Sequence, residues 1–139
     1  MTPEQIFSLA NPAATLGWVL LLAAPRRRWA TFVAGRVIPL GLAAAYLVLF
    51  VVHWFEGKGG FSTLQGVADL FSNPWLLLAG WIHYLAFDLF VGAWETEDAM
   101  ARGISRWLLA PCLLLTFLIG PVGFLAYHAL VAVRRVRPA

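Results

Sequence analysis

The stretch GWIHYLAFDLFVGAWE, residues 80–95, is apolar enough to lie in a lipid bilayer, yet it carries an acid, an imidazole and a phenol. Acidic residues inside membrane segments are rare, face the protein interior or a water-filled cavity, and commonly mark a functional site. Asp88 lies a few residues past the middle of this apolar segment. We therefore predict a functional site at Asp88. The alternative is a structural bond to Arg36, Asn11 or a free backbone carbonyl.

Helical geometry separates the polar side chains of this stretch into two groups. Tyr84 precedes Asp88 by four residues, so their side chains can meet on one face of a helix. His83 projects about 140° away from Asp88 at 3.6 residues per turn. The candidate catalytic residues are thus Asp88, His83 and Tyr84, and His83 belongs to the same site only if another helix or the ligand joins the two faces.

Aromatic and small polar side chains recur on this segment and on the other apolar segments. They can line a cavity shared with Asp88, or they can serve close packing between helices. The candidate ligand-binding residues are Asn11, Trp18, Trp81, Phe87, Thr116 and Tyr127.

Metal and nucleotide cofactors are not expected. The three histidines fall in different segments and none forms a His-x-x-x-His or Glu-x-x-His pair. There is no phosphate-binding glycine loop and no Gly-x-Ser-x-Gly element. The sequence therefore predicts no metal site and no cofactor.

The whole chain has the composition of an integral membrane protein. Its 139 residues are 61% hydrophobic and only 12% charged, with a mean hydropathy of +0.78, whereas soluble domains carry about 25% charged residues. The arginine clusters at 26–28 and 134–137 flank apolar segments, which is typical of membrane anchoring. We expect the lipid bilayer as a partner and no binding to nucleic acid.

Hydropathy and helix-boundary residues predict one all-α domain, residues 1–139. It is a bundle of four transmembrane helices with a short interfacial helix between the second and third spans, within residues 57–72. Ser62 and Gln65 form a possible capping box for that short helix. A polar connection is expected after Trp94, and Pro111 and the GPVG element are expected to bend or interrupt the last span. The predicted spans are about 3–24, 33–55, 74–94 and 106–133.

If all four predicted spans cross the membrane, the distribution of basic residues specifies the orientation only weakly. Six basic residues then fall on one side and four on the other, which favours both termini outside. The C-terminal arginines lie on the less basic side and oppose this assignment.

Three segments together resemble the abscisic-acid-deficient-four-like family: FSLANPAATLGWVLLLAAP, GWIHYLAFDLFVGAW and LAPCLLLTFLIGPVGFLAY. The most specific element is W-[IV]-H-x-L-x-x-D-L-F. The resemblance places the family's His and Asp on His83 and Asp88, and its Pro-x-Gly element on Pro121 and Gly123. Plant members of the family are membrane proteins required to make neoxanthin from violaxanthin.

This resemblance implies a membrane protein that acts on or binds a carotenoid or related isoprenoid, by cofactor-free acid–base isomerisation as in neoxanthin formation. Two alternatives stay open: a non-catalytic carotenoid-binding, lipid-binding or scaffold protein, and a small proton or solute transporter. The Ala-, Arg- and Gly-rich composition favours a multi-pass protein of a bacterial cytoplasmic membrane. A homo-oligomer is a further possibility.

Overall fold

The computed structural model of the protein describes residues 1–136, which contain helices and no strand. Four segments are long and apolar enough to cross a membrane by length and composition: α1, the continuous stretch from α2 to η2, α5 and α6, the last taken over its whole length. This confirms the predicted all-α membrane fold. In chain order the elements are α1 (Pro3–Ala23), α2 (Arg28–Phe32), the π-helical turn η1 (Val33–Val37), α3 (Ile38–His53), the 3₁₀ turn η2 (Trp54–Glu56), α4 (Leu64–Leu70), α5 (Pro74–Ala101) and α6 (Arg106–Val136).

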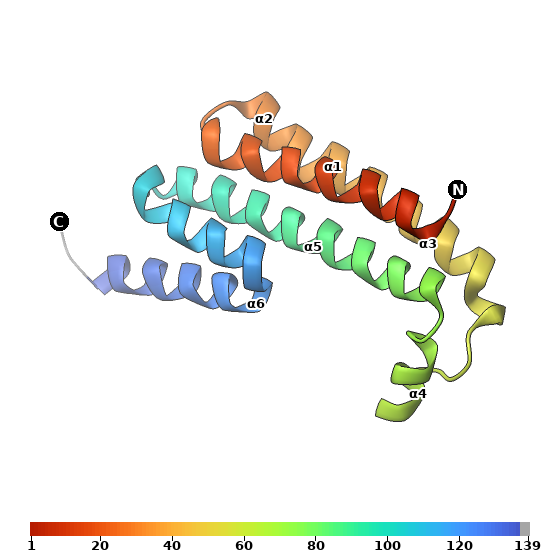
Figure 1. Ribbon diagram of the computed structural model, residues 1–139. Coiled ribbons are helices and arrows are strands. Elements are labelled where there is room, and N and C mark those ends of the chain that lie inside the picture. Colours follow the sequence, from red (N-terminus) through yellow and green to blue (C-terminus); the bar gives the residue numbers. More distant parts are fainter. Residues whose placement is uncertain (137–139) are drawn as a thin grey trace.

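Helix α5 is the centre of the fold, because α1, α3 and α6 all pack against it (Figure 1). Ile82 and Leu89 on α5 are completely buried. Small residues let the neighbouring helices approach closely. A Cβ atom on Gly17 would lie 2.5 Å from Leu89, and one on Gly92 would lie 2.5 Å from Trp18. The outer faces of α1 and α3 carry exposed large apolar side chains, as a lipid-facing surface requires.

Helix α1 runs without a break through Pro12, in agreement with the predicted first span of about 3–24. Thr2 caps it by accepting from the backbone N–H of Gln5, while the Gln5 side chain accepts from the backbone N–H of Thr2. This capping box fixes the start of the first span.

The second span begins at Arg28, five residues before the predicted start at Val33. A π-helical turn precedes Pro39, which has no N–H to give to the carbonyl of Gly35. The Arg36 guanidinium donates to that carbonyl at 3.1 Å instead. A π turn of this kind is a local irregularity that often accompanies functional sites.

The third span is longer than predicted. The polar residues after Trp94 do not form a connection, because α5 continues to Ala101. Glu95 and Thr96 are completely buried. Thr96 donates to the carbonyl of Gly92 at 2.8 Å, and Glu95 accepts from a residue of α6, so both polar side chains are satisfied inside the helix bundle.

The last segment reverses its direction. Ile119 has a non-helical backbone (φ −146°, ψ 68°) and divides α6 into two helices, which run side by side as a hairpin (Figure 1). A Cβ atom on Gly123 would collide with the backbone of Thr116, although seven residues of straight helix would separate these positions by about 10 Å. The predicted interruption at GPVG is therefore a complete reversal. We call the pair of helices the α6 hairpin and the residues around Ile119 and Gly120 its tip.

The short helix predicted between the second and third spans is α4. Its N-cap is Thr63, whose side chain accepts from the N–H of Gly66 at 3.0 Å. The predicted capping box of Ser62 and Gln65 is wrong, because Gln65 donates to Asp69 at 2.8 Å.

Candidate functional site

The hairpin tip lies against Asp88 on α5. A Cβ atom on Gly120 would lie 2.5 Å from Asp88 Oδ1 and 2.7 Å from Oδ2, so the carboxyl group occupies the space that a larger residue would fill. Asp88 Oδ2 is buried and has no hydrogen-bond partner among the described residues. Buried polar atoms are almost always satisfied, so an orphan of this kind calls for an explanation.

Tyr84 connects the Asp88 carboxyl group to the hairpin. Its hydroxyl donates to the carbonyl of Phe117 over 3.5 Å. That carbonyl lacks its usual helical donor because the residue four positions later is Pro121. The Tyr84 hydroxyl also lies close enough to the Asp88 carboxyl to interact with it. The predicted contact between these two residues on one helical face is therefore present.

A cavity of about 260 Å³ opens beside Asp88 and Tyr84. The other lining residues come from α1, α5 and the hairpin tip: Asn11, Ala14, Thr15, Trp18, Trp81, Leu85, Phe117 and Leu118. Trp81 Nε1 donates to Asn11 Oδ1 at 2.9 Å, and the rings of Trp18 and Phe117 lie 5.4 Å apart. We call this space the Asp88 cavity. It brings together five of the nine candidate residues: Asp88, Tyr84, Asn11, Trp18 and Trp81.

A second cavity of about 340 Å³ extends along the groove between α1 and α5 towards the N-terminus. Its lining is apolar apart from Glu4, and Trp81 lines both spaces. Phe7 lies beside Trp81 at the junction, with ring centroids 5.9 Å apart. The two cavities follow α1 from Pro3 to Trp18, a length of about 22 Å.

His83 and Phe87 do not join this site. His83 lines a separate cavity with residues of α3 and α4, and its ring lies 5.5 Å from that of Tyr46 and 4.6 Å from that of Phe87. Phe87 lines a groove between α3 and α5. The two faces that helical geometry separated in the sequence are therefore also separate in the fold.

Thr116 and Tyr127 lie deeper in the hairpin and contact two other acids of α5. Thr116 Oγ1 lies 3.0 Å from both carboxylate oxygens of Glu95. Tyr127 donates to Asp98 Oδ2 at 2.6 Å. These two candidates thus hold the hairpin to α5 and do not line the Asp88 cavity. Glu95 and Asp98 were missed as site residues because the sequence indicated a connection there, although Glu95 shares a helical face with Asp88.

The two side chains considered as structural partners of Asp88, Arg36 and Asn11, bond to other groups instead. Arg36 pairs with Glu97 at 3.4 Å. Asn11 donates to the carbonyl of Phe7 and accepts from Trp81. Within residues 1–136, no group of three or more His, Cys, Asp or Glu side chains is arranged to hold a metal ion.

Comparison with known proteins places this chain in a family. The family model described as ABA DEFICIENT 4-like matches residues 5–127, which include the Asp88 cavity and the hairpin tip. No curated protein and no solved structure gives a significant match. The chain belongs to the ABA DEFICIENT 4-like family of membrane proteins.

Proposed function

We propose that the protein binds a carotenoid or related isoprenoid in the Asp88 cavity and isomerises its end group by acid–base chemistry without a cofactor. The observation that carries the proposal is the buried, unpartnered Oδ2 of Asp88 beside an aromatic cavity. A carboxyl oxygen left without a protein partner is available to a polar group of a ligand. The family match supports a carotenoid-related ligand.

The proposed reaction converts an epoxide end group into an allenic alcohol. The epoxide C–O bond opens as its oxygen gains a proton, and a carbon-bound proton leaves, so the atoms balance and no electrons are exchanged. A carboxyl group in an apolar site can give the first proton. Its carboxylate can then regain a proton from the ligand carbon, directly or through the Tyr84 hydroxyl. One carboxyl group and one phenol are therefore sufficient.

The groove between α1 and α5 suits the polyene of such a ligand. With the end group at Asp88, the chain would pass Trp81 and Phe7 and continue along the apolar second cavity. Aromatic side chains supply large apolar contact surfaces for a conjugated chain. In this arrangement His83 and Phe87 touch neither the end group nor the polyene.

The test is conversion of an epoxycarotenoid, violaxanthin, by the protein in reconstituted membranes. The products are separated by chromatography and their masses are determined by mass spectrometry. We expect a product of unchanged mass with an allenic end group. His83→Gln is the matched control and should convert the substrate as the wild type does. Pigment that binds without turnover would contradict catalysis and support the carrier alternative, and absence of both would contradict the proposal.

A second candidate function is proton transport, supported by a different observation. Asp88, Glu95 and Asp98 follow one another along α5 beneath the α6 hairpin, from the hairpin tip to the end of the helix. Intramembrane acids arranged in this way are typical of proton relays. Proton flux in liposomes that disappears with Asp88→Asn and needs no carotenoid would favour this function.

A further inference from the structure

The α6 hairpin gathers the arginines at one end of the molecule. The α1–α2 connection, the α5–α6 connection and the C-terminal end of α6 all lie at the same end (Figure 1). Arg137 follows outside the described residues. The opposite end carries Lys58 together with Glu4, Glu56 and Asp69. The described arginines at or near the basic end are Arg26, Arg27, Arg28, Arg36, Arg102, Arg106 and Arg134.

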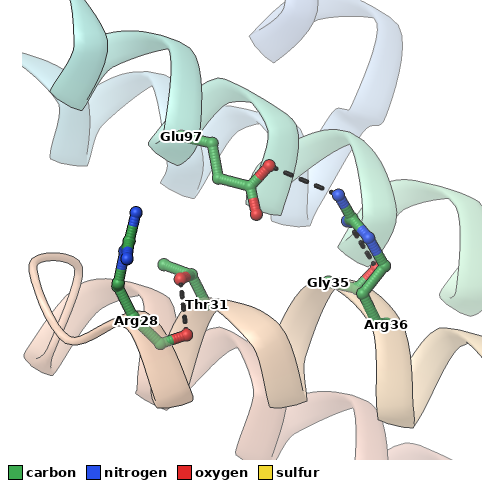
Figure 2. A network of polar contacts seen from close by, with 5 residues as sticks. All are labelled: Arg28, Thr31, Gly35, Arg36 and Glu97. Atoms are coloured by element: carbon green, nitrogen blue, oxygen red, sulfur yellow. Dashed lines mark hydrogen bonds and ion pairs between the residues drawn. The ribbon is translucent and has the colours of Figure 1, made fainter.

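Two of these arginines line a groove of about 530 Å³ between α2–η1 and α5. The guanidinium groups of Arg28 and Arg36 both point towards α5, with Glu97 between them (Figure 2). Glu97 pairs with Arg36 at 3.4 Å, whereas no carboxylate of the described residues pairs with Arg28. The groove thus offers one paired and one unpaired cation to an incoming anion, and its charged side chains sum to +1.

An apolar groove of about 250 Å³ continues from this position between α3 and α5. Arg36 lines both spaces, and its guanidinium lies 5.7 Å from the centre of the Phe90 ring. Beyond Arg36 the walls are aliphatic and aromatic as far as Ala43. Residues 28 to 43 cover about 22 Å along the helix, more than the roughly 15 Å hydrocarbon depth of one leaflet.

We propose that this groove binds an anionic phospholipid, with the phosphate on the unpaired Arg28, beside the Arg36–Glu97 pair, and one acyl chain along the apolar groove. Charge and shape select this occupant. The guanidinium groups are forked donors that match phosphate oxygens, and the apolar extension runs from the headgroup position towards the middle of the bilayer. Phe32 and Leu40 beside the groove are 59% and 68% exposed, so a bilayer lipid can enter from the side.

Native mass spectrometry of the purified protein tests this site, with phosphatidylglycerol and phosphatidylcholine of identical acyl chains as the probes. Phosphatidylglycerol should be retained in preference. An arginine close to the bound anionic headgroup adds about fivefold to lipid binding, so Arg28→Gln should weaken retention about fivefold and the Arg28→Gln/Arg36→Gln double variant about thirtyfold. Ala43→Trp, which fills the apolar groove without changing charge, should also weaken it.

The matched control is Arg106→Gln, which removes a charge from the same end but lines neither groove; Arg106 stacks on Trp107 at 4.6 Å. Arg28→Gln breaks no side-chain ion pair, so it keeps the test valid if the double variant fails to fold. Equal retention of both lipids, or equal weakening by Arg106→Gln and Arg28→Gln, would overturn the proposal.

Discussion

At the residue scale, the site depends on a close contact between a glycine and an acid. Gly120 leaves space for the Asp88 carboxyl group. The Tyr84 hydroxyl donates to the carbonyl of Phe117, which Pro121 leaves without a helical donor. The sequence predicted Asp88 and its contact with Tyr84, because both follow from helical spacing within one segment. The partners across the fold could not be predicted in the same way, because Phe117 and Leu118 belong to α6 and line the cavity only through the packing of that helix against α5.

Gly120→Ala should displace the hairpin tip, because the new Cβ atom would lie 2.5 Å from the Asp88 carboxyl. Overpacking of this kind costs about 1–3 kcal/mol, so thermal unfolding in detergent should occur at a lower temperature and bound pigment should be lost. Gly41→Ala is the control, because a Cβ atom there meets nothing within 4 Å and alanine is favoured over glycine in a helix. Equal stability of the two variants would contradict the contact.

At the element scale, the α6 hairpin is the feature that sequence patterns described least well. Gly120 and Pro121 predicted an interruption, but a proline alone allows anything from a bend to a reversal. The outcome depends on Gly123 packing against Thr116, a contact that exists only once the helix has broken, and on Tyr127 reaching Asp98 on another helix. The sequence placed the end of the third span too early for a related reason. Glu95 is typical of a solvent-exposed connection, and only its contact with Thr116 on α6 explains its burial.

Gly123→Leu should force the two helices of the hairpin apart, because even a Cβ atom collides with the Thr116 backbone. We expect a loss of stability greater than that caused by Gly120→Ala, since the obstacle is backbone and not a movable side chain. Hydrogen exchange should then increase in both halves of α6 while α1 and α3 keep their protection. Unchanged exchange in α6 would argue against the hairpin.

At the scale of the whole molecule, the hairpin changes the membrane orientation that the sequence left undecided. Four complete spans would divide the basic residues six to four, but the reversal brings the C-terminal end of α6, with Arg134, to the same end as the two connections (Figure 1). The first half of α6 covers about 20 Å and the second about 25 Å, each less than a hydrocarbon core of about 30 Å. From the positive-inside rule we therefore predict that the basic end lies on the inner side of the membrane.

Cysteine labelling in sealed vesicles checks this topology. With a membrane-impermeant maleimide, Ala101→Cys and Arg134→Cys should react from the same side and Ser62→Cys from the other. The wild type is the control, because its single cysteine, Cys112, is buried. Reaction of Arg134→Cys from the side of Ser62→Cys would show that α6 crosses the membrane completely.

The role of Asp88 as the catalytic acid is tested most directly by violaxanthin turnover of Asp88→Asn in reconstituted membranes. Asparagine keeps the size of the side chain but removes the exchangeable acid proton, and a positioned general acid or base contributes about 10²–10⁴ in rate. We therefore expect kcat to fall by at least about a hundredfold while pigment still binds. Full conversion by a folded Asp88→Asn protein would contradict the assignment of Asp88 as the catalytic acid.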